Sequence, residues 1–471
     1  MRRWISLVII FLILNLSSVM AQELGDKAAK LEQNIEELRK ELESLRVEQK
    51  ALKELQGQQT GGLAEELRKL KLEIFAPEAE YKSYTGLGPA ASKVYFKDRG
   101  LSIGGYGELN YEGYQHKSKK DRADASRFVL YTGYKFTDRI LMNAEFEYEH
   151  AGINNVGGST GGVTPSVSSS RNPEVYLEFG YLDFLLHPRF NLRSGLLLTP
   201  IGLINEYHEP TIFHGVLRPD VERILIPSTW RDLGVMGYGG MGDFEYKVGL
   251  LNGLRSDRLS SSDWIRGGRQ QGAGASAEGL AGVGRLDYKG IPGLTLGGSY
   301  YFGQADFGRG ADTDPIGPGE KKADINLWEL HADYKFKGLE LRGLFTRGSL
   351  DGNRAFDLSP PGGVGEEVQG WYLETAYDLM PLIRAGLAMS LTPFMRYENY
   401  DTHEQVFSGR KNPTLDREVI TLGLGFKPHP NVVIKADYQW RGTDSRLPVG
   451  KGAGRDEGKI DQFNVGIGFI F

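Results

Sequence analysis

The sequence predicts an all-β transmembrane barrel of about 16 antiparallel strands, preceded by an α-helical coiled coil. Three observations predict this fold class. Apolar and polar residues alternate over many short segments, the connections alternate between tight turns and long polar loops, and an apolar heptad repeat lies near the N-terminus. The composition agrees, because 63 glycines and 11% aromatic residues suit many short strands in a barrel wall.

The first residues predict export from the cytoplasm. Arg2 and Arg3 precede an apolar stretch from Ile5 to Leu16, and Val19 to Ala21 supply a small-residue cleavage pattern. This stretch is too short for an uncleaved membrane anchor, which needs about 20 apolar residues. We therefore expect a signal peptide over residues 1–21.

The segment after the signal peptide carries the heptads. Apolar residues recur at alternating spacings of four and three, at Leu24, Ala28, Leu31, Ile35, Leu38, Leu42, Leu45 and Leu52. This spacing favours a self-associating coiled coil over residues 22–75, in the periplasm, although a lone helix packed on the barrel would show a similar stripe. Residues 76–100, rich in Tyr, Ser, Gly and Pro, read as a linker to a barrel over residues 101–471.

The last strand shows the alternation clearly. Phe463, Val465, Ile467 and Phe469 alternate with Gln462, Asn464, Gly466 and Gly468, so one face suits lipid and the other suits water. A mean hydropathy of −0.36 fits such strands, since only every second residue faces lipid. A β-sandwich also alternates, but short turns that alternate with long loops are typical of outer-membrane barrels.

A barrel of this width leaves an aqueous channel, so we expect the functional residues in its lumen. The alternation predicts that charged residues of both signs line the pore: Arg127, Lys135, Glu145, Glu147, Glu178, Arg193, Lys247, Arg285, Lys335, Arg342, Arg396 and Lys435. The alternative for each of these residues is a structural ion pair with a neighbouring strand.

The third long loop, Ile201 to Ser228, combines apolar anchors with closely spaced charges. We expect it to fold into the lumen and narrow the channel, although apolar loop residues would also suit packing on a neighbouring subunit. The predicted constriction residues are Glu206, His208, Glu209, His214, Arg218, Asp220, Glu222 and Arg223.

Several barrel segments resemble a known family. GYGELNYEGY (105–114), SRFVLYTGYKFTDRI (126–140), YLDFLLHPRFNLRSGLLLTPIGLINEYHEP (181–210) and the terminal Phe471 are similar to porins grouped with the phosphate-selective porins O and P. The resemblance implies an inward third loop, a homotrimer, and anion selection by rows of Arg and Lys in the lumen. The alternation also predicts inward positions for His331, Glu108, Glu329, Asp333, Glu340, Glu374, Glu398 and Asp437. With these residues the predicted inward acids are as many as the bases, which leaves the solute and its charge open.

We therefore expect an outer-membrane porin with a water-filled channel for passive diffusion of small hydrophilic solutes or ions. The alternative is a structural protein whose barrel anchors a coiled coil that tethers the outer membrane to the cell wall. Expected partners are outer-membrane lipid, further copies of the chain, the barrel-assembly machinery through Phe471, and peptidoglycan through the coiled coil.

The other function classes have weak support. A net charge of −5 gives no reason to expect a nucleic-acid partner. The spacing contains no catalytic triad pattern, so we expect neither an enzyme nor a cofactor. Glu206, His208, Glu209 and His214 could suggest a metal site, but two His and two Glu in a loop occur readily by chance, and we expect no metal.

The heptads yield the first testable prediction. An isolated peptide covering residues 22–75 should self-associate, because without the barrel its apolar stripe can be buried only against another copy. The resemblance to porins predicts a trimer. Sedimentation equilibrium measures its mass directly. A monomer at high concentration would refute self-association of this segment.

Overall fold

The computed structural model describes Lys27, residues 30–47, Lys50, and residues 82–151, 174–306, 323–352, 363–384, 388–407, 409–446, 448–449 and 456–471. The chain divides into two units, Met1–Ala79 and Glu80–Phe471. The predicted signal peptide and most of the predicted coiled coil lie outside the described residues.

Within the first unit, residues 30–47 form an α-helix. Its heptad side chains, including Leu31, Leu38 and Leu45, are exposed in the single chain. The helix agrees with the spacing of the apolar residues, while its self-association stays a prediction. No helix among the described residues is both long and apolar enough to cross a bilayer.

The described residues of the second unit form a sheet of 17 strands closed on itself. Sixteen of them form the wall, and the two-residue strand β8 (Leu254–Arg255) pairs with β10 inside one long connection. The wall strands are β1 (Gly100–Tyr114), β2 (Arg122–Thr137), β3 (Ile140–Glu149), β4 (Glu174–His187), β5 (Phe190–Leu198), β6 (Arg231–Met241), β7 (Phe244–Asn252), β9 (Leu280–Tyr288), β10 (Leu294–Asp306), β11 (Ala323–Phe336), β12 (Leu339–Gly352), β13 (Gly365–Tyr377), β14 (Ser390–Val406), β15 (Asp416–His429), β16 (Val432–Thr443) and β17 (Gln462–Ile470).

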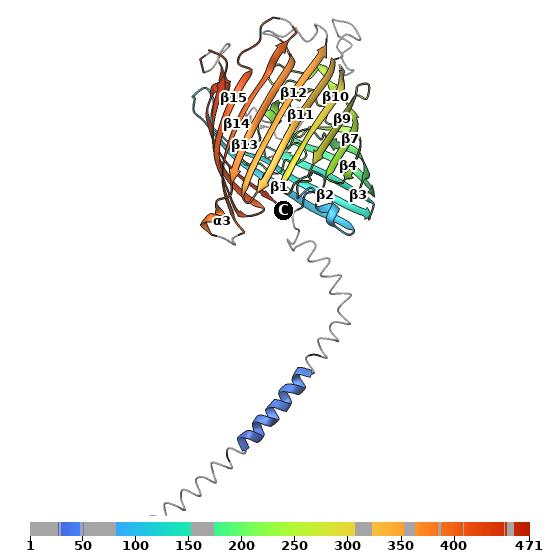
Figure 1. The fold of residues 1–471 in the computed structure, drawn as a ribbon, viewed down its shortest axis with the longest axis vertical. Coiled ribbons are helices and arrows are strands. Elements are labelled where there is room, and N and C mark those ends of the chain that lie inside the picture. Colours follow the sequence, from blue (N-terminus) through green and yellow to red (C-terminus); the bar gives the residue numbers. More distant parts are fainter. Residues whose placement is uncertain are drawn as a thin grey trace, which may run out of the picture. The chain divides into compact units, whose positions relative to one another are not determined.

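Each wall strand pairs antiparallel with its neighbours in the chain, and β1 pairs with β17 to close the barrel. The short connections, such as residues 138–139, 188–189 and 337–338, lie at one rim, and described parts of the longer connections, such as residues 115–121 and 409–415, lie at the other (Figure 1). The short helix α3 (Met380–Ile383) lies at the same end of the barrel as the C-terminus in this view. The prediction of about 16 antiparallel strands in a closed barrel is confirmed.

The two faces of the wall differ as the alternation predicts. In β17, Gln462 and Asn464 are buried, whereas Phe463 and Ile467 are exposed on the outer face. Aromatic pairs on this outer face lie near the short-turn rim: Tyr134 with Phe136, Phe244 with Tyr288, and Tyr334 with Phe336. Such belts are typical of the level where a bilayer meets water.

Side chains from the wall do not fill the barrel alone. Residues 82–97, here named the inner segment, contain the 3₁₀ turn η1 (Lys93–Phe96), and they bury Leu87, Ala90 and Val94. Part of the expected linker is therefore packed against the wall. At Gly133 a Cβ would lie 2.5 Å from the Cβ of Val94, so only glycine leaves room for the segment there.

Closure of the barrel gives the second prediction. The N–H of Phe471 donates to Gly105 O at 2.9 Å, and the N–H of Gly105 donates to Phe471 O at 2.9 Å. The Phe471 ring also stacks on Phe128 of β2, with ring centroids 6.0 Å apart. The substitution Phe471→Asp removes this contact and places a charge on the outer face at the seam, so it should lower the folded fraction several-fold. The heat-dependent shift in electrophoretic mobility measures that fraction.

Phe190→Asp is the matched control, because Phe190 is also an outward aromatic residue beside a short turn but lies away from the seam. Equal losses from the two substitutions would show that the seam has no special role in assembly.

Candidate functional site

Residues 199–230, here named the crossing loop, connect β5 to β6 and contain the π-helical turn η2 (Val221–Leu225). Their apolar residues are the anchors that the sequence singled out. Ile201, Ile204, Leu225 and Ile226 are all at most 1% exposed. The loop is therefore packed within the protein rather than extended into solvent.

One side of the crossing loop contacts β3, β4 and β7. The Nε2 atom of His208 lies 3.3 Å from Glu145 Oε1 on β3 and 3.5 Å from Glu178 Oε2 on β4. Lys247 on β7 pairs with Glu206 at 2.5 Å. Arg218 donates to the backbone oxygen of His208 at 3.3 Å, which holds the loop against itself.

The other side contacts strands from the second half of the chain. Tyr372 on β13 donates to Glu222 at 2.6 Å, and Lys435 on β16 donates to Phe213 O at 2.6 Å. The backbone N–H of Val216 donates to Asp437 Oδ2, also on β16, at 2.6 Å. The crossing loop thus spans the lumen between opposite parts of the wall.

Asp220 is the most heavily paired acid of the loop. It accepts hydrogen bonds from Tyr400 at 3.0 Å, from Arg223 at 2.6 Å, and from Arg441. Although burial acts to raise it, the pKa of Asp220 stays far below its usual range because Arg223 and Arg441 stabilise the carboxylate. Asp220 therefore anchors the crossing loop to β14 through Tyr400 and to β16 through Arg441.

Glu209 joins the crossing loop to the inner segment. Its carboxylate accepts N–H bonds from Ala90 at 2.9 Å and from Ala91 at 3.0 Å. Burial raises the pKa of Glu209 to about 7, although these two donors and Lys93 act to lower it. The contact between the two interior segments therefore includes a group that titrates near neutral pH.

The wall charges predicted to line the pore lie on the inner face, and most of them are paired. Lys335 is the most exposed, with 48% of its side chain accessible. The pairs are Arg127 with Glu108 and Glu147, Arg193 with Asp183, Arg285 with Asp287, Lys335 with Glu340, Arg342 with Asp333 and Glu374, and Arg396 with Glu374 and Glu398; Lys135 donates to Lys97 O. These contacts fit the alternative of structural ion pairs as well as a polar lining.

A polar cavity of about 250 Å³ separates the crossing loop from the wall of β12 to β16. Phe213 and His214 line it on the loop side, and His214 Nε2 lies 3.2 Å from Glu340 Oε2. Lys427 and Lys435 supply positive charge from the wall. Its lining also includes Asp378, Ser390 and Val433, at strand ends beside short connections, so the cavity lies near the short-turn rim.

Sequence reasoning missed several residues of this site. The contribution of Ala90 and Ala91 was hidden, because their donors are backbone N–H groups of a segment expected to be a linker. Arg231 pairs with Glu178 at 3.1 Å. It is the first residue of β6, and no pattern in the neighbouring sequence indicated that its side chain faces the lumen. Gly468 was a usable sequence signal for the close approach of another segment. It lies on the inner face of β17, where a Cβ would lie 2.5 Å from Pro210 of the crossing loop.

The chain is similar to one curated relative over most of its length. An uncharacterised protein of Aquifex aeolicus (strain VF5) is 36% identical over 383 residues, which cover 79% of this chain and 82% of the relative. No family model matches the chain.

Solved structures give more distant likenesses. OmpF of Salmonella typhi in complex with daunomycin is 11% identical, covers 79% of this chain and 98% of its own, and has a TM-score of 0.49. The outer membrane channel DcaP of Acinetobacter baumannii is 11% identical, covers 79% of this chain and 97% of its own, and has a TM-score of 0.48.

Glu209 yields the third prediction. Its pKa of about 7 in the folded protein lies above its ordinary value of 4.5, because burial disfavours the carboxylate, so the folded state binds the proton more tightly than the unfolded chain. The free energy of unfolding should therefore fall as the pH rises from about 4.5 to 7, by up to about 3 kcal/mol. Hydrogen exchange of residues 82–97, corrected for the intrinsic rate, should increase across this window.

Glu209→Gln provides the control, because a neutral amide cannot titrate. Its exchange should depend little on pH. A wild-type profile as flat as that of the variant would rule out Glu209 as the titrating group.

Proposed function

The chain belongs to the same family as the Aquifex aeolicus protein, and we propose that it forms an outer-membrane channel for passive diffusion of small hydrophilic solutes or ions. The observation that carries this proposal is the crossing loop, which spans a closed barrel and leaves a polar cavity beside the wall. A solute path in a barrel of this width requires such a polar interior.

The outer surface supports a membrane location. Large apolar side chains are exposed on strands around the barrel, for example Phe128, Leu250, Leu330 and Ile434. A surface of this kind is stable in lipid and promotes aggregation in water. By analogy with outer-membrane barrels, the short turns face the periplasm and the long loops face the exterior.

The crossing loop is the proposed constriction. Groups of both signs lie beside the cavity, with Lys427 and Lys435 against Glu340 and Asp378. Opposed charges in a narrow gap orient polar solutes, whereas a lining of one sign selects ions. We therefore expect modest ion selectivity, and we do not extend the phosphate preference of the resembling porins to this chain.

Assembly completes the proposal. We propose that the barrels form a homotrimer and that the barrel-assembly machinery recognises Phe471. We also propose that the coiled coil lies in the periplasm, within reach of peptidoglycan. The competing function, a barrel that only anchors a tether, requires no conducting path. Conductance of the full chain separates the two.

The fourth prediction concerns the constriction. Full-length protein in a planar bilayer should show discrete channels, and shortening the loop between Glu206 and Arg223 should raise their conductance severalfold because the narrow gap is removed. Single-channel recording in a salt gradient, with and without millimolar phosphate, measures conductance, selectivity and block together.

A variant shortened within residues 409–413 is the control, because this part of the β14–β15 connection is largely exposed. Its conductance should match that of the native protein. No conductance from correctly folded native protein would favour the tether, equal conductance of both shortened variants would place the constriction elsewhere, and strong phosphate block would establish an anion-binding channel.

A further inference from the structure

We propose that Glu145, Glu178 and His208 bind one divalent transition-metal ion of the zinc class, and that this ion fastens the crossing loop to β3 and β4. The inference stands apart from the channel function, because a barrel without conductance would still bind the ion.

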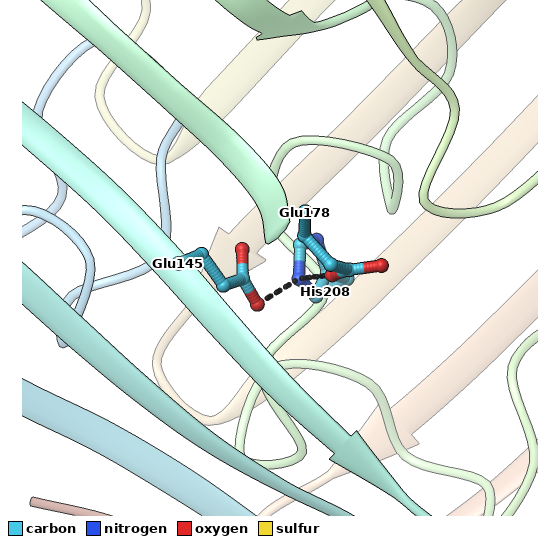
Figure 2. Close-up of side chains that lie close together, drawn as sticks. All are labelled: Glu145, Glu178 and His208. Carbon is cyan, nitrogen blue, oxygen red and sulfur yellow. Dashed lines mark hydrogen bonds and ion pairs between the residues drawn. The ribbon is translucent and has the colours of Figure 1, made fainter. Parts of the chain in front are cut away.

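The ligand atoms converge on one point. His208 Nε2 lies 3.3 Å from Glu145 Oε1 and 3.5 Å from Glu178 Oε2, and the three side chains offer ligand atoms within 4.8 Å of one another (Figure 2). Zinc bound tetrahedrally at about 2.0 to 2.1 Å requires ligand atoms about 3.3 Å apart. The two nitrogen–oxygen distances already match that spacing.

The orientation of the His208 ring favours a cation at this point. Its Nδ1 atom lies 2.8 Å from the backbone oxygen of Asn205. A carbonyl oxygen only accepts hydrogen bonds, so Nδ1 carries a proton, and in the neutral ring Nε2 presents a lone pair to both carboxylates. A backbone carbonyl that orients the other nitrogen is the usual arrangement behind a metal-bound histidine.

The carboxylates provide a second, independent observation. Glu145 and Glu178 are both fully buried. Within the part of the chain that the structure describes, neither Glu145 Oε2 nor Glu178 Oε2 has a hydrogen-bond partner. Arg231 pairs with Glu178 Oε1 at 3.1 Å, which leaves Oε2 directed at His208.

These ligands narrow the class of ion. Calcium and magnesium prefer sites made of oxygen atoms, whereas one imidazole and two carboxylates suit zinc and neighbouring first-row divalent ions. Water would supply the fourth ligand. Arg231 already pairs with Glu178, so such an ion would chiefly offset the buried charge of Glu145, which is costly without a counter-charge.

Calorimetric titration tests the proposal on the full chain in detergent, after treatment with a chelator and dialysis. Zn²⁺ should bind with one ion per chain, and Co²⁺ should give the visible absorption of a four-coordinate site. The substitutions His208→Gln and Glu178→Gln should each weaken Zn²⁺ binding at least tenfold, in line with about 10- to 100-fold losses for outer partners of metal ligands.

His214→Gln is the matched control, because His214 lies in the same loop but away from Glu145 and Glu178, with its Nε2 3.2 Å from Glu340 Oε2. It should bind Zn²⁺ like the native chain. Heat-dependent electrophoretic mobility verifies that each variant is a folded barrel, and Glu145→Gln serves as a ligand variant if another fails to fold.

Two outcomes would overturn the proposal. The first is no stoichiometric Zn²⁺ binding by the folded native chain, or equal binding by the ligand variants. The second is a Glu145→Gln variant that is more stable than the native chain while Zn²⁺ leaves the stability of both unchanged. That result would assign the cluster to a proton shared between carboxyl groups.

Discussion

Closure of the sheet by β1 and β17 is the constraint on which the rest of the structure depends. It pairs the backbone groups that would otherwise face lipid at two open edges. It also fixes a wall of 16 strands, whose lumen is too wide for inward side chains to fill. The crossing loop and the inner segment occupy part of that space, and the polar cavity lies beside the loop.

Filling the lumen places many charges in a poorly hydrated interior. The wall brings acids and bases there together, and the interior segments supply further partners, such as Asp220 for Arg441 and Glu206 for Lys247. A buried charge without a partner is far more costly than a paired one. Loss of one member of a pair would therefore leave the other charge buried at a high cost in stability. The cluster of Glu145, Glu178 and His208 differs, because the histidine there faces two acids, of which Glu178 also pairs with Arg231.

Much of the fold was predictable from the sequence, because a strand between lipid and water must alternate. That rule placed Phe463 outward and Asn464 inward, and turn spacing gave the number of strands. The apolar residues of the connection from Ile201 to Ser228 also singled out the crossing loop in the sequence. The partners within the lumen were not predictable, because Glu145 and His208 lie far apart in the chain and meet only when the loop folds back. The docking of residues 82–97 escaped detection because its polar bonds come from the backbone.

The contacts of the crossing loop with the last strands impose an order on barrel biogenesis. Pro210 sits against Gly468 on β17, and Lys435 on β16 holds the backbone at Phe213 and Gly215. Those partners are synthesised more than 200 residues after the loop, as the separations of 222 and 220 residues for the Lys435 bonds indicate. The interior can therefore reach its final arrangement only after the wall is nearly complete. Packing of the lumen therefore depends on the last strands of the wall, since without β16 and β17 the crossing loop loses its contacts at Pro210, Phe213 and Gly215.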